Sequence, residues 1–239
     1  MYRNRIFMVM FLLCIIPLAM VHAQRGAGTY SIGGFGGVGR IMGPEAYKDW
    51  TKMGTGFGGE FKFNMTEMTT LGISYTNLSF PMDNQKVEKD FEPVIQLIFP
   101  DATIEIDPFN LKAGIISANL IQYFTAPDAS AGFYGTIGVG YYMLTTEDSK
   151  MTITVPGLPP EEEKMEGGDP ENKLGLNGGL GLEIALGETI NLVIEGKYHY
   201  ILSELEKDAE TQEMEEALGK SMSGKITFIG IMGGLIISL

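Results

Sequence analysis

The feature that most constrains the fold is a period-two alternation of apolar with small or polar residues, repeated along most of the chain. In 174–184, Leu and Ile fill most alternate positions, while glycines, Asn177 and Glu183 stand between them. The segment 190–200 repeats the pattern, and its second face carries Asn191, Glu195, Lys197 and His199. Because successive side chains of a strand point to opposite faces, each segment predicts a strand with one apolar face.

Eight segments of this kind are predicted as strands. Their lengths suit the roughly 9–11 tilted residues that a strand needs to cross a membrane. The facing of the first strand is ambiguous because it is rich in glycine, the parity of the fourth is open, and the last is apolar on both faces. The predicted strands are 28–39, 54–65, 69–78, 111–124, 132–144, 173–185, 189–202 and 225–239.

The connections between these strands alternate in length. Those after the second, fourth and sixth strands are short, at 66–68, 125–131 and 186–188. Those after the first, third, fifth and seventh are long, at 40–53, 79–110, 145–172 and 203–224. Short turns at one end and long loops at the other are typical of outer-membrane barrels, whose long loops lie outside the cell. A soluble β-sandwich has no reason to sort its loops in this way.

Acidic residues gather in the long loops. Loop 79–110 has seven acidic residues and two lysines, and loop 203–224 has the same count. The segment 145–173 has eight acidic residues and three lysines. Such clusters predict solvated loops, and an acidic surface disfavours binding to nucleic acid. Within the second long loop, 94–99 and 102–107 predict an additional hairpin above the membrane.

Together these patterns predict an all-β protein, a closed eight-stranded antiparallel up-and-down transmembrane β-barrel. In hydrocarbon every backbone amide must be paired, so the sheet must close and lose its edges. Eight strands leave an interior just wide enough for side chains to fill. Buried charges there must neutralise one another, so a salt-bridged plug is favoured over a proton or ion path. The predicted polar network of the lumen comprises Glu60, Lys62, Asn177, Glu183, Asn191, Glu195, Lys197 and His199.

The N-terminal segment predicts a cleaved signal peptide, residues 1–23, ahead of a barrel domain at 24–239. Arg3 and Arg5 precede an apolar run over 6–16 that is too short for a spanning helix, and a small-x-small site ends at Ala23. Cleavage there would remove the only cysteine and leave one histidine, which excludes disulfides and a multi-histidine metal site. No cofactor is predicted.

Two segments carry a resemblance to a known family. Residues 176–183 (LNGGLGLE) and 191–200 (NLVIEGKYHY) are similar to the sixth and seventh strands of the OmpA-like and OmpW-like eight-stranded outer-membrane barrels. The C-terminus also resembles the signal read by the barrel-assembly machinery, through Gly234, Ile237 and Leu239, although the family usually ends in an aromatic residue. The resemblance implies an outer-membrane location and contact with lipopolysaccharide and the assembly machinery.

Three functions remain open from the sequence. The favoured one is a non-enzymatic barrel with a filled lumen, which contributes to the envelope or presents acidic loops at the surface. The first alternative is a narrow pore or a conduit for small hydrophobic molecules. The second is a membrane-embedded, lipid-modifying enzyme that uses His199. Ser203 follows four residues later, roughly 13 Å along a strand, which is too far for direct base catalysis.

Overall fold

The computed structural model describes residues 26–165, 167, 170–205 and 209–239. The predicted signal peptide at 1–23 lies outside these residues. Within the described part of the chain, no helix is both long and apolar enough to cross a membrane.

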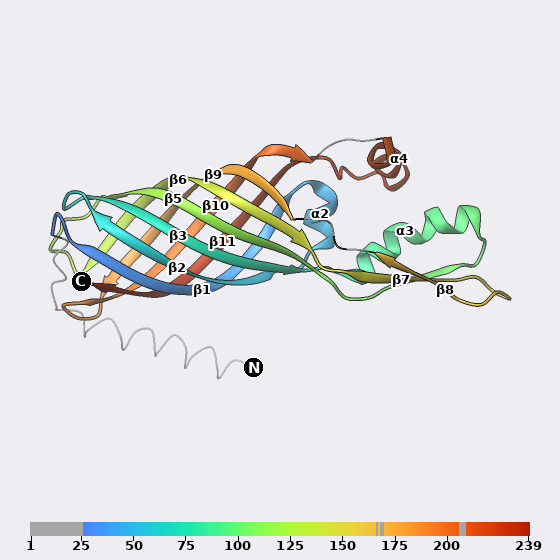
Figure 1. Cartoon of the computed structure of the whole chain (residues 1–239), viewed down its shortest axis with the longest axis horizontal. Coiled ribbons are helices and arrows are strands. Elements are labelled where there is room, and N and C mark those ends of the chain that lie inside the picture. The colour runs from blue at the N-terminus through green and yellow to red at the C-terminus, as the bar shows by residue number, and fades with distance from the viewer. Residues whose placement is uncertain (1–25, 166, 168–169, 206–208) are drawn as a thin grey trace, which may run out of the picture.

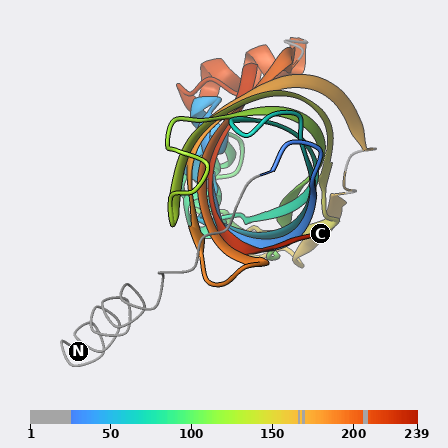
Figure 2. The same ribbon diagram turned by 90° about the vertical axis from the view of Figure 1, so that its left-hand side faces the viewer.

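Eight long antiparallel strands form a closed barrel, in which each strand pairs with a neighbour on both sides. Figure 1 shows the strands running obliquely along the barrel, and Figure 2 shows the closed ring from one end. The order around the barrel is β1-β11-β10-β9-β6-β5-β3-β2. This arrangement confirms the predicted fold class. The strands are β1 (Tyr30–Gly43), β2 (Gly54–Asn64), β3 (Thr69–Pro81), β5 (Asn110–Tyr123), β6 (Ala131–Thr146), β9 (Glu171–Ala185), β10 (Ile190–Leu205) and β11 (Gly224–Ser238).

The alternation separates the two faces of the sheet as predicted. In β9, Leu176 and Leu180 are exposed on the outside, while Asn177 and Glu183 are buried inside. The structure also shows which residues point into the barrel in β5 and β11, which the sequence left open. In β5, alternate residues from Ala113 to Tyr123 are buried in the interior. In β11 the two apolar faces are distinct, because one set is buried inside the barrel and the other is exposed on its outer surface.

The short connections lie at the end of the barrel where the C-terminus is found, and the long ones lie at the opposite end (Figure 1). The long connections are shorter than predicted, because barrel strands such as β1 and β3 continue beyond their expected ends. The rest of these connections is largely structured. They contain α2 (Glu45–Trp50), α3 (Asn84–Ile98), β4 (Thr103–Ile106), β7 (Ser149–Thr154), β8 (Glu161–Met165) and α4 (Ala209–Leu218).

The additional hairpin predicted for 94–99 and 102–107 is wrong. The first segment belongs largely to α3, in which Val87, Phe91 and Ile95 recur at the four-residue spacing of one helix face. The second segment forms β4, which pairs with β7 of the third long connection instead. A short apolar run is ambiguous between helix and strand when read without its surroundings.

The structured parts of the four long connections pack into one unit, here called the head. Its core contains Trp50, Val87 and Ile106, with Phe91 and Met151 packed against them. A three-stranded sheet of order β4-β7-β8 extends from this core. The described parts of the long loops therefore form an ordered structure on one end of the barrel (Figure 1).

Candidate functional site

A buried carboxylate, Glu183, is the centre of the polar network inside the barrel. Its Oε2 accepts a 2.6 Å hydrogen bond from the Tyr123 hydroxyl, and its Oε1 accepts one of 2.8 Å from Asn191 Nδ2. Lys62 Nζ lies 3.4 Å from Glu183 and 3.6 Å from Glu60. One ammonium group thus lies between two carboxylates from different strands. These contacts neutralise charges that would be costly to bury alone.

A second group lies on β10, where Lys197 and Glu195 form an ion pair of 2.7 Å. The Tyr134 hydroxyl donates a 3.2 Å hydrogen bond to Glu195 from β6, which is separated from β10 by β9. The same tyrosine ring lies 5.3 Å from Lys62 Nζ, which links this group to the one around Glu183. Lys62 of β2 and Glu183 of β9 thus meet across the lumen, whereas Glu195 and Lys197 pair along a single strand.

His199 and Asn177 occupy a different position from the charged groups. They lie opposite one another in the register of β10 and β9, and both are buried. The Nδ1 atom of His199 is 3.0 Å from the Tyr142 hydroxyl, and its ring stacks on Phe228 with 4.5 Å between centroids. Ser203 is exposed. These contacts hold the imidazole as a packed side chain among aromatic rings.

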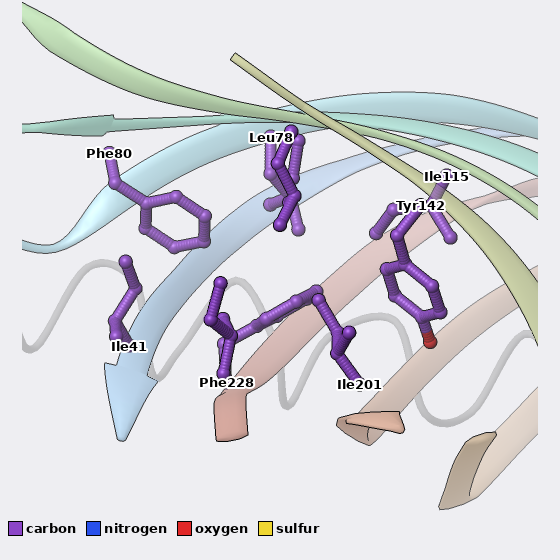
Figure 3. Close-up of a cluster of buried hydrophobic side chains, with 10 residues drawn as sticks. Ile41, Leu78, Phe80, Ile115, Tyr142, Ile201 and Phe228 are labelled. Atoms are coloured by element: carbon purple, nitrogen blue, oxygen red, sulfur yellow. The ribbon is translucent and has the colours of Figure 1, made fainter. Parts of the chain in front are cut away.

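A cluster of apolar side chains fills the lumen at the end next to the head (Figure 3). Phe80 and Phe228 meet edge to face with 5.9 Å between centroids, and both are almost fully buried. This apolar cluster was not predicted from the sequence, which indicated a polar network in the lumen. Its members are Ile41, Leu78, Phe80, Ala113, Ile115, Tyr142, Leu144, Ile201, Ile226 and Phe228.

A cavity of about 40 Å³ lies in the middle of the lumen. Its lining includes Glu60, Ser74, Glu195 and Lys197 on the polar side and Met232 among its apolar residues. One water molecule needs a cavity volume of roughly 10–15 Å³, so this cavity has room for a few water molecules.

Several residues of the interior network were not predicted from the sequence. Tyr123 donates the shortest hydrogen bond to Glu183. The sequence did not predict that it points inward, because it left open which alternate residues of this strand face the lumen. Tyr134 lies on the predicted inward parity, but only the fold brings its ring over Gly181, where an added Cβ would overlap ring atoms. The glycine on β9 thus makes room for the tyrosine on β6. A pattern of alternating glycines indicates such space without identifying the side chain that fills it.

The residues of the predicted assembly signal lie at the end of the last strand. Ile237 and Leu239 are exposed on the outer surface. Gly234 pairs with Phe35 across the β1–β11 seam, and a Cβ there would overlap the backbone of β1. Close packing at the seam accounts for the glycine, and recognition by an assembly machine stays a prediction.

In the head, one cluster of side chains joins three of the long connections. Trp50 Nε1 donates a 2.7 Å hydrogen bond to Asp90 Oδ2, and Lys220 Nζ lies 2.6 Å from the same oxygen. Lys220 also lies 3.4 Å from Asp49. Burial raises the pKa of Asp90, but the hydrogen bonds from Lys220 and Trp50 outweigh it and hold the pKa below its usual range. The hydrogen bond to Asp90 raises the pKa of Lys220.

No group of three His, Cys, Asp or Glu side chains in the described segments is arranged to hold a metal ion.

No model of a known protein family matches the chain, and no curated protein sequence matches it. Solved structures with a similar arrangement include the N-terminal β-barrel domain of OprF from Pseudomonas aeruginosa, at 14% identity and a TM-score of 0.44, covering 90% of this chain and 99% of that one. The outer membrane protein OprG from Pseudomonas aeruginosa has 15% identity and a TM-score of 0.45, with 91% and 99% covered. Neisserial surface protein A has 10% identity and a TM-score of 0.47, with 87% and 96% covered.

Proposed function

We propose that the chain is an outer-membrane β-barrel with a filled lumen. Its role is structural, and it presents its acidic head at the cell surface. The observation that carries this proposal is the belt of large apolar side chains on the outside of the closed barrel. Every barrel strand contributes to it, and Phe57 and Ile137 are 67% and 66% exposed. The belt includes Ile32, Phe57, Ile73, Ile116, Leu120, Ile137, Val139, Leu176, Leu180, Ile194, Ile231 and Leu235.

A continuous belt of this kind favours lipid over water as its surroundings. Soluble monomers rarely expose contiguous apolar patches larger than about 300–600 Å². Aromatic rings gather near the end with the short connections, where Tyr30 stacks with Phe61 at 5.7 Å and Phe124 meets Phe133 at 5.8 Å. Rings in such a position suit the boundary between lipid and water.

The interior supports a filled lumen over a pore. The apolar cluster occupies one end of the lumen and the network around Glu183 lies nearer the other, with the small cavity between them. An aqueous pore needs a continuous path, and an eight-stranded barrel is normally just wide enough for its own side chains. The packing of His199 between Tyr142 and Phe228 supports a structural role for it over a catalytic one.

The location is tested by fractionating the cell envelope and by electrophoresis with and without boiling. We expect the protein in the outer-membrane fraction, with a change of mobility on heating that marks opening of a closed barrel. A protein that stays in solution without detergent would contradict the membrane proposal.

The filled lumen is tested separately with the purified protein in planar bilayers. We expect no conductance steps and no uptake of apolar probes. Regular steps would favour the pore, and uptake of apolar probes would favour the conduit. If His199→Ala altered the modification of lipid A, the enzymatic alternative would replace the proposal.

A further inference from the structure

The far end of the head exposes a set of large apolar side chains outside the membrane belt. Leu97 is 86% exposed, Ile98 is 70% exposed and Phe99 is 45% exposed, at the C-terminal end of α3. Leu158, in the turn between β7 and β8, is 61% exposed. We call these four residues the distal patch.

The strand pairing brings the two parts of the distal patch to the same end of the head. Thr103, at the start of β4, lies opposite Thr154 at the end of β7. The turn that follows α3 is therefore beside the turn that contains Leu158. Figure 1 shows α3 and the β7–β8 hairpin beyond the barrel, on the side away from the C-terminus. The apolar belt of the barrel is thus separate from this patch.

The inner face of α3 is already used by the head core, to which Val87 and Phe91 contribute. Leu97 and Ile98 of the distal patch are consequently apolar side chains of the helix that the head core leaves uncovered. Exposed apolar side chains in a group commonly mark a binding surface in a water-exposed region.

The surroundings of the patch are strongly acidic. The segments 90–111 and 151–163 contain eight acidic residues and no lysine or arginine, and two of these carboxylates, Asp90 and Glu162, are ion-paired with Lys220 and Lys150. Glu161 and Glu163 are exposed on β8, beside the turn that holds Leu158. Asp101 is exposed in the turn that follows α3. An apolar centre with an acidic rim is complementary to a surface that has apolar groups among positive charges.

We infer that the distal patch binds a cationic, amphipathic segment of another protein. Its apolar side chains would cover Leu97 and Ile98, and its lysines or arginines would face the surrounding carboxylates. A second copy of this chain is disfavoured because two acidic tips repel each other, and an anionic lipid surface is disfavoured for the same reason. The inference rests on the proposed function, which places the head outside the membrane.

The test uses the full chain in nanodiscs of zwitterionic lipid, with empty nanodiscs as the blank. The probe is a synthetic helical peptide of leucine and lysine. Two reference peptides are a scrambled version and one with glutamate in place of lysine. We expect the amphipathic cationic peptide to bind more tightly than both, and added salt to weaken it.

Variants then locate the binding. The double variant Leu97→Ser with Ile98→Ser should weaken binding about tenfold or more, because anchors at the centre of an interface carry most of its affinity. The matched control is Met214→Ser, an exposed residue on α4, which should stay within about twofold. The double variant Glu161→Gln with Glu163→Gln should slow association at low salt and matter little at high salt.

The inference is overturned if the Leu97 and Ile98 variant binds as the parent does, or if the acidic peptide binds equally well. It is also overturned if sedimentation shows a dimer that depends on Leu97, or if empty zwitterionic vesicles compete for the patch. Nanodisc titration does not depend on where the cell places the protein. Failure of the proposed location would therefore be seen in fractionation alone.

Discussion

The indole nitrogen of Trp50 donates a hydrogen bond of 2.7 Å to the carboxylate of Asp90, and this contact joins the first long connection to the second. Lys220 binds the same carboxylate oxygen from the fourth connection. The third connection joins through the pairing of β7 with β4. The ordered head thus depends on a few contacts between segments that are far apart in the chain.

Replacing Asp90 should loosen the head while leaving the barrel closed. The substitution Asp90→Ala leaves the buried Trp50 N–H unpaired, which we expect to cost about 1–3 kcal/mol. Hydrogen exchange of α3 backbone amides measures the change. The exposed residue Glu105 offers a control, since Glu105→Ala should change stability by less than about 0.5 kcal/mol. Equal exchange in the two variants would contradict a special role for Asp90.

The same cluster predicts how the head responds to pH. The pKa of Asp90 is lowered in the folded state. The stability that its ionised carboxylate gives to the head is therefore complete above the unfolded pKa of about 3.9, and it is lost as the pH falls through the lowered pKa. The pKa of Lys220 is raised in the folded state. The stability that its ammonium group gives to the head is therefore complete below the unfolded pKa of about 10.4, and it is lost as the pH rises through the raised pKa.

We therefore expect protection of the head to be constant between about pH 5 and about pH 9, and to decline below about pH 4. Hydrogen exchange corrected for the intrinsic dependence on pH measures this protection. In Asp90→Asn the acid-side decline should be smaller. An unchanged decline in that variant would assign the transition to other carboxylates.

Inside the barrel, Lys62→Met should destabilise the fold by about 3–5 kcal/mol, because it leaves the buried carboxylates without their cation. Urea unfolding in lipid vesicles, followed by circular dichroism, measures the loss. Adding Glu183→Gln to the same chain should recover part of it by removing one unpaired charge. If Lys62→Met alone were as stable as the parent, the buried carboxylates would not need Lys62 to neutralise them.

Two glycines on neighbouring strands test the close packing of the lumen. Gly181→Ala should cost about 1–3 kcal/mol, because the new methyl group overlaps the Tyr134 ring. Gly196 lies on the neighbouring strand with nothing within 4 Å of its Cβ position, so Gly196→Ala should be close to neutral. The unfolding midpoint in urea compares the two. A similar loss in both variants would point to backbone effects instead of ring overlap.

Much of the barrel follows from local patterns. The alternation in 174–184 and 190–200 predicts which residues face outward, because a strand sends successive side chains to opposite sides. The alternation of short and long connections predicts an up-and-down order around the ring. Gly196 and Leu180 are on the predicted outer faces for this reason, and Asn177 and Glu183 are on the inner ones.

The sequence by itself determined the eight barrel strands and the two faces of those with a clear alternation, since both are encoded by neighbours in the chain. The meeting of Tyr123 with Glu183 depended on the stagger of strands around the closed ring, which no local pattern specifies. The same is true of the apolar cluster around Phe228 and of α3, whose apolar run suits a strand or a helix equally. Contacts between distant segments decided these features, because only the closed sheet and the packed loops bring the partners together.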